Sequence, residues 1–127
     1  HNCIYMIYIN LDKVGVCTSS VCALHCMLMP FVLVNAGSLG VLAFLGNPIM
    51  EWLVLAIVLF VGMVAILPSF MKHRRAYVLV LFFSGLLLII NAEFVELMGA
   101  KISLSGIGGA LMAYAHYENL KLRTSRL

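Results

Sequence analysis

Residues 52–71 read WLVLAIVLFVGMVAILPSFM and contain no charged side chain. An α-helix needs about 20 apolar residues to cross the hydrocarbon core of a bilayer, so this stretch predicts a transmembrane helix. The whole chain agrees, because 64% of its 127 residues are hydrophobic and only 10% are charged. A soluble domain carries about a quarter charged residues. We therefore expect an integral membrane protein.

Three further apolar stretches approach the same length, near residues 14–34, 76–91 and 97–117, the last interrupted by Lys101. None shows the alternating pattern of a barrel strand. Backbone amides in hydrocarbon must then be paired within helices. The sequence thus predicts one all-α transmembrane domain over residues 1–127, folded as an integral membrane four-helix bundle.

The positive charges are distributed unevenly along this arrangement. Residues 72–75, Lys-His-Arg-Arg, form the whole connection between the second and third spans, so those helices should be antiparallel neighbours. Of the eight Lys and Arg residues, only Lys101 falls on the side opposite this turn. The positive-inside rule then predicts a multi-pass protein with this turn and both termini in the cytoplasm. The bases on the predicted inner side are Lys13, Lys72, Arg74, Arg75, Lys121, Arg123 and Arg126.

Two segments have an unusual content of small residues. Residues 35–50 are apolar but rich in Asn, Gly and Pro, and they could extend the first helix, lie at the interface or re-enter the bilayer. The fourth span contains small residues four apart, such as Ser105, Gly109 and Ala113. Small residues at this spacing allow helix backbones to approach closely. We expect them to pack within the chain, with a homo-oligomer interface as the alternative.

The first span contains the sequence Cys22-Ala-Leu-His25-Cys26, which places two thiols and an imidazole on one helical face. Met29 falls in the same stripe, whereas Cys17 lies on nearly the opposite face. Thiolate and thioether ligands select soft metals. Each of these residues alone is more often a packing residue, but together they predict a soft-metal or thiol site.

The predicted position of these thiols supports a functional role. With the span starting at residue 14, Cys22 and Cys26 lie roughly 12–18 Å into the ~30 Å core. A bound cation would displace thiol protons, and His25 is placed to accept one. Pro30 cannot donate to the carbonyl of Cys26 and should kink the helix beside the site. Ionisable groups inside the membrane are functional candidates by default.

Other polar side chains are weaker metal candidates. The acidic residues predicted on the outer side would attract a cation, and His116 near the inner end of the fourth span would receive it on exit. Interfacial Glu and His often only anchor helix ends. The acidic candidates are Glu51, Glu93 and Glu96.

The pattern Asp12-x-x-Gly15-x-x-x-Ser19-x-x-Cys22-x-x-His25-Cys26-x-x-x-Pro30 resembles the MerC-type mercury-resistance membrane proteins. The resemblance covers nearly the whole chain, although the best-known branch of that family has its membrane thiols as C-x-x-C. Weaker matches follow along the chain: Glu51, His73, Glu96 and His116-x-x-Asn119.

This resemblance implies a transporter or carrier, not an enzyme. It would move mercuric ion or another soft divalent metal across a bacterial inner membrane to a cytoplasmic metal acceptor. No permanent cofactor is implied, because the metal is the cargo.

Two other functions are consistent with the same residues. The first is a membrane thiol-disulfide oxidoreductase that uses Cys22 and Cys26, although Cys3 and Cys17 are poorly placed to form a relay pair. The second is a membrane protein that binds metal without transporting it. The chain has no Gly-rich nucleotide-binding motif and no basic tract typical of nucleic-acid binding. We therefore expect the metal ion and the lipid bilayer to be its partners.

Overall fold

The computed structural model describes residues 2–36 and 47–125, and all the regular secondary structure in those ranges is α-helix. The predicted all-α fold is confirmed. The described residues form four helices, α1 (Asn2–Ala36), α3 (Pro48–His73), α4 (Ala76–Glu93) and α5 (Met98–Thr124).

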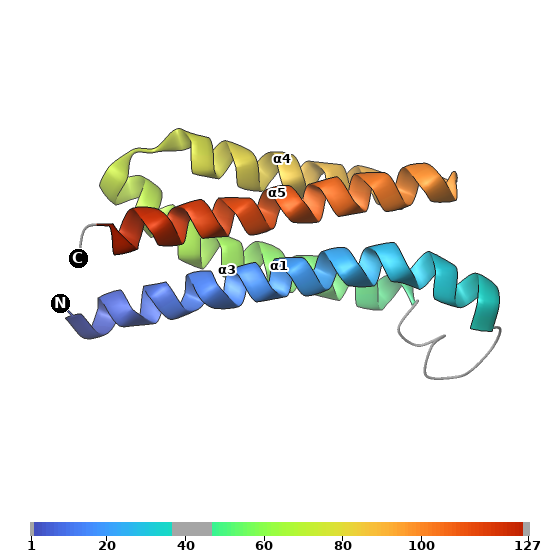
Figure 1. The fold of residues 1–127 in the computed structure, drawn as a ribbon, viewed down its shortest axis with the longest axis horizontal. Helices are drawn as coiled ribbons and strands as arrows, with labels where there is room; N and C mark the ends of the chain where they lie inside the picture. The colour runs from blue at the N-terminus through green and yellow to red at the C-terminus, as the bar shows by residue number, and fades with distance from the viewer. Residues whose placement is uncertain (1, 37–46, 126–127) are drawn as a thin grey trace.

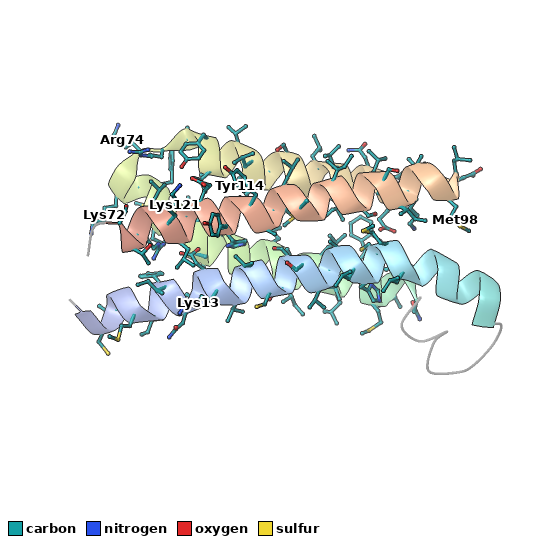
Figure 2. All side chains as sticks on the ribbon, viewed as in Figure 1. Lys13, Lys72, Arg74, Met98, Tyr114 and Lys121 are labelled. Carbon is teal, nitrogen blue, oxygen red and sulfur yellow. The ribbon has the colours of Figure 1, made fainter. Side chains whose placement is uncertain are left out.

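The four helices lie side by side and alternate in direction (Figure 1). The beginning of α1 and the end of α5 lie at the same end of the bundle as the turn between α3 and α4. Helix α5 packs mainly against α1 and α4, and α3 packs against α1 and α4 with fewer contacts to α5. Lys72, Arg74 and Lys121 gather at this shared end, and Met98 lies at the opposite end (Figure 2).

The boundaries of α3 follow from local chemistry. Its first turn is capped by Asn47, whose side-chain oxygen accepts a hydrogen bond from the Ile49 N–H at 3.0 Å. Pro48 at the first helical position needs no hydrogen-bond acceptor. The helix ends at Arg74, which has a φ of 50° and donates its N–H to the Phe70 carbonyl at 2.7 Å. Helix α4 begins directly afterwards, and so the predicted tight antiparallel turn is confirmed.

Within the part of the chain that the structure describes, three helices are long and apolar enough to cross a membrane: Met6–Leu28 within α1, Pro48–Lys72 within α3, and α4. Helix α5 is less apolar and is not among them. It is nevertheless 27 residues long and packs along α1 and α4. The predicted fourth span at residues 97–117 stays a prediction. Helix α1 also begins at Asn2, well before the predicted first span.

Large apolar side chains cover the outside of the bundle. Phe60 is 71% exposed and Leu87 is 61% exposed, whereas Phe82, Ile89 and Met112 are buried between the helices. A soluble protein rarely shows so large a continuous apolar surface. This surface suits hydrocarbon as the surrounding solvent.

The small residues of α5 pack within the chain, as we expected. A Cβ atom added to Gly109 would lie 2.2 Å from the Cβ of Ala23 on α1. A Cβ atom on Gly108 would lie 2.6 Å from the carbonyl oxygen of Gly85 on α4. Glycines at these positions therefore let α5 approach both neighbours closely.

The segment between α1 and α3 lies largely outside the described residues. Helix α1 continues through Pro30 to Ala36, and α3 starts at Pro48. The three arrangements considered for residues 35–50 concern mainly 37–46, which are not described.

Candidate metal site

The residues that carry the resemblance in α1 form its buried face. Asp12, Gly15, Ser19, Cys22 and Cys26 are all buried, and their spacing alternates between three and four residues. This spacing places side chains in one stripe along a helix. The motif in α1 therefore faces the other helices of the bundle.

The two cysteines of the predicted site lie together in this buried stripe. Cys22 is 1% exposed and Cys26 is 8% exposed, and their thiols are within hydrogen-bonding range of each other. His25 also interacts with the Cys26 thiol. Cys3 and Cys17 are exposed. The structure thus places two thiols and one imidazole together, while Cys17 faces outward as predicted.

A lateral groove between α1 and α3 leads to these residues. It has about 250 Å³ of free volume and is lined by Thr18, Val21, Cys22, His25, Val54 and Ile57. Val21 is 65% exposed and Ile57 is 49% exposed, so apolar residues form the rim. The groove brings the surface of the bundle within reach of Cys22 and His25.

Two thiols are the strongest soft-metal ligands in this arrangement. Among the described residues, no group of three or more His, Cys, Asp or Glu side chains is placed to hold one ion. The side chain of Met29, a weaker candidate, lies outside the described residues. A two-thiolate site suits a soft ion of low coordination number, because soft ions prefer sulfur ligands to oxygen ligands.

Contacts between helices show how deep the thiols lie. Ala23, between the two cysteines, packs against Gly109 on α5, and the neighbouring Gly108 packs against Gly85 on α4. Gly85 is at the middle of α4. Cys22 and Cys26 therefore lie level with the middle of α4, and their depth in a membrane stays a prediction.

At the end of the bundle opposite the α3–α4 turn, two of the three predicted acidic residues come together. The carboxyl groups of Glu51 and Glu93 interact with each other, and Lys101 forms an ion pair with Glu93 at 3.2 Å. Glu96 is exposed. Lys101 offsets part of the negative charge that would attract a cation to this end.

The end of the bundle that holds the α3–α4 turn, predicted to be the inner end, contains a buried polar cluster that crosses three helices. Asn119 on α5 donates a hydrogen bond to Asp12 Oδ1 on α1 at 2.7 Å and another to the Ala65 carbonyl on α3 at 3.2 Å. Arg123 pairs with Asp12 at 3.2 Å and also donates to the Ala65 carbonyl. We call these four residues the inner clamp. None of them is more than 4% exposed.

His116, the predicted exit residue, lies directly beside this cluster. Its Nδ1 atom is 3.6 Å from Asp12 Oδ1, and its ring makes an edge contact with Phe82. A Cβ atom on Gly15 would lie 2.4 Å from the ring, so Gly15 provides the space that His116 occupies. The imidazole is fully buried.

Reasoning from the sequence missed the role of Asp12 and Arg123. Arg123 was counted as an inner-surface base, but the structure buries it between Asp12 and the Tyr8 ring, whose centroid is 4.8 Å away. The spacing of His116, Asn119 and Arg123 on one face of α5 was the available signal. An unpaired arginine on a helix and one that pairs across the bundle look alike in sequence.

These features define an integral membrane four-helix bundle with a buried thiol pair on α1. Comparison with known protein families makes the assignment specific. The model of the family described as MerC mercury resistance protein matches residues 12–121, and the chain belongs to this family. Neither a curated protein nor a solved structure matches it.

Proposed function

We propose that this protein carries mercuric ion, or another soft divalent metal, across the bacterial inner membrane toward the cytoplasm by binding it at Cys22 and Cys26. The observation that supports this proposal most directly is the contact between two buried thiols at mid-depth. Membership of a mercury-resistance family supports the same metal. The protein acts as a carrier, with no catalytic step.

Charge balance favours thiols as the ligands at this depth. A divalent cation that binds two thiolates releases two protons and leaves a neutral complex. A neutral complex avoids most of the cost of placing a charge in an apolar interior. His25, which interacts with Cys26, is placed to accept one of the released protons.

The proposed direction of transport follows from the two ends of the bundle. Both chain ends and the basic α3–α4 turn lie at one end, which the positive-inside rule assigns to the cytoplasm. Glu51 and Glu93 at the other end would attract the cation, and Glu96 would add to this attraction. His116 lies between the thiols and the cytoplasmic end, where it would meet the ion on exit. A cytoplasmic thiol would then take the ion by ligand exchange.

The test is uptake of labelled mercuric ion into vesicles, together with equilibrium binding to the purified protein. We expect the Cys22→Ala/Cys26→Ala variant to lose both uptake and high-affinity binding. The matched control is Cys3→Ala/Cys17→Ala, which removes the two exposed cysteines and should retain both. Equal loss in the two variants would refute the proposal.

Uptake and binding, together with a disulfide-reduction assay, separate the alternative functions. Binding that depends on Cys22 and Cys26 without uptake would identify a metal-binding protein that does not transport. Reduction of an added disulfide by Cys22 and Cys26, without metal binding, would identify a thiol-disulfide oxidoreductase. Either result would overturn the transport proposal.

A further inference from the structure

Between the thiols and the cytoplasmic end, the buried polar side chains fall into two groups. The Ser19 hydroxyl and both ring nitrogens of His116 have no hydrogen-bond partner among the described residues. A buried polar group without a hydrogen bond is costly, and water or a passing ligand can offset that cost. Asp12, Asn119 and Arg123 contact one another through one hydrogen bond and one ion pair, although the two atoms of the ion pair, Asp12 Oδ2 and Arg123 Nε, make no hydrogen bond among the described residues. Ser19 and His116 lie nearer the thiols, and the Asp12–Asn119–Arg123 contacts lie nearer the predicted cytoplasmic end.

The position of the inner clamp places it across the proposed path. Asp12 lies on the same buried stripe of α1 as Cys22, and ten residues of helix separate them by about 15 Å. The clamp joins α1, α3 and α5 at that level. An ion that leaves the thiols along this stripe toward the cytoplasm therefore meets the Asp12–Arg123 ion pair.

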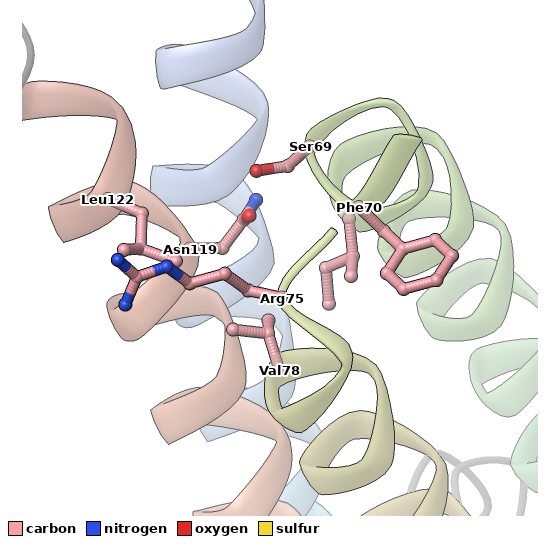
Figure 3. A pocket seen from close by; sticks show the side chains of 7 residues that line it. Ser69, Phe70, Arg75, Val78, Asn119 and Leu122 are labelled. Atoms are coloured by element: carbon pink, nitrogen blue, oxygen red, sulfur yellow. The ribbon is translucent and has the colours of Figure 1, made fainter. Parts of the chain in front are cut away.

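The end of the bundle is tightly closed beside the clamp. Figure 3 shows a crevice there, with Asn119 on α5 and Ser69 on α3 facing each other. The crevice is lined by Ile66, Ser69, Phe70, Arg75, Val78, Asn119 and Leu122, and it is too narrow to admit a water molecule.

Helix α3 has a feature that would let the clamp open. Pro68 lies inside α3 and cannot donate a hydrogen bond to the carbonyl of Val64, so the helix is weakened there. Three residues earlier, the Ala65 carbonyl accepts hydrogen bonds from Asn119 and Arg123. The clamp thus holds α3 next to its weakest point. Release of these two bonds would free the last turns of α3 to bend away.

We propose that the inner clamp is the cytoplasmic gate of the metal path. Its closed state, held by the Asp12–Arg123 pair and the bonds to Ala65, separates Cys22 and Cys26 from the cytoplasm. Opening breaks these contacts and bends α3 at Pro68. This inference rests on the proposed transport function, because a gate requires a path.

Accessibility of the two thiols tests the gate without using mercury. The Cys3→Ala/Cys17→Ala protein, which retains only Cys22 and Cys26 of its four cysteines, is reconstituted in liposomes. A membrane-impermeant maleimide is applied to either face, and labelling is followed by mass spectrometry. We expect slow labelling from the face of the α3–α4 turn.

Variants of the clamp should increase thiol labelling from the cytoplasmic face only. Asp12→Asn and Arg123→Gln should each raise labelling from the cytoplasmic face about tenfold, which corresponds to about 1.4 kcal/mol in the closed–open equilibrium. The matched control is Lys121→Gln, an exposed base on the same helix, which should leave the rate unchanged. Rates within about twofold of the parent for both clamp variants would overturn the proposal.

Labelling from the second face and a double variant distinguish an opened gate from a destabilised fold. General loosening would raise labelling from both faces equally, and this result would also overturn the proposal. Asp12→Asn/Arg123→Gln leaves no uncompensated buried charge and should still label faster from the cytoplasmic face. Mercuric-ion binding, measured separately, reports on the thiol site. Failure of the gate proposal would therefore appear in the labelling rates, and failure of the proposed metal site would appear in the binding measurement.

Discussion

Replacing Gly109 with alanine should destabilise the bundle by forcing α5 away from α1. The added Cβ atom would lie 2.2 Å from the Cβ of Ala23, whereas ordinary contacts of this kind are 3.4–4 Å. Helices α1 and α5 would have to separate by at least about 1 Å. Overpacking of this kind costs about 1–3 kcal/mol, and the better helix propensity of alanine offsets about 0.5–1 kcal/mol. We expect a net loss of about 1–2 kcal/mol.

The assay is thermal unfolding of the purified protein in detergent, with Gly99→Ala as the matched control. Gly99 also lies on α5, but an added Cβ atom there meets nothing within 4 Å. Gly99→Ala should unfold at the wild-type temperature or slightly above it, and Gly109→Ala several degrees below, at about 2–8 °C per kcal/mol. If the two variants unfold at the same temperature, the close contact between α1 and α5 does not control stability.

Four further results are expected. Gly15→Ala should cost about 1–3 kcal/mol in unfolding experiments, because its Cβ atom would lie 2.4 Å from the His116 ring; wild-type stability would show that the ring moves freely. In titrations with mercuric ion, Cys22→Ala should abolish high-affinity binding and Cys17→Ala should not, and equal damage would contradict the shared-face argument. Glu51→Gln should slow vesicle uptake modestly, and less so at high salt, because only long-range attraction is lost; a large, salt-independent defect would instead indicate a direct ligand. A C-terminal reporter should be active only in the cytoplasm, and periplasmic activity would refute the predicted topology.

Much of the fold follows from local sequence patterns. The uncharged run at residues 52–71 lies inside α3, and α3 and α4 are separated by residues 74–75, within the connection expected at 72–75. The ends of the helices were harder to place. Helix α1 begins at Asn2 because its apolar first turns continue the helical pattern without a breaker. The predicted span starts at residue 14, after the charged Asp12 and Lys13, whereas the stretch of α1 that is long and apolar enough to cross a membrane is Met6–Leu28.

Part of the candidate site was also readable from helical spacing. Residues three and four apart share a face, and so Cys22, His25 and Cys26 could be grouped without a structure. Cys17 was excluded on the same ground, and the structure places it at the surface. These predictions succeed because they need only the geometry of one helix.

Contacts between helices could not be predicted in this way. The sequence by itself determined that the chain is a helical membrane bundle with two thiols on one face, since both properties depend on composition and on 3.6-residue periodicity. Only the tertiary structure placed Asp12 beside residues more than 100 positions away, Asn119 and Arg123. The partner of a buried charge depends on how the helices are arranged and on their relative register. Neither is encoded in the pattern of a single helix, so Arg123 resembled a surface anchor until the packing of α5 against α1 and α3 showed its role.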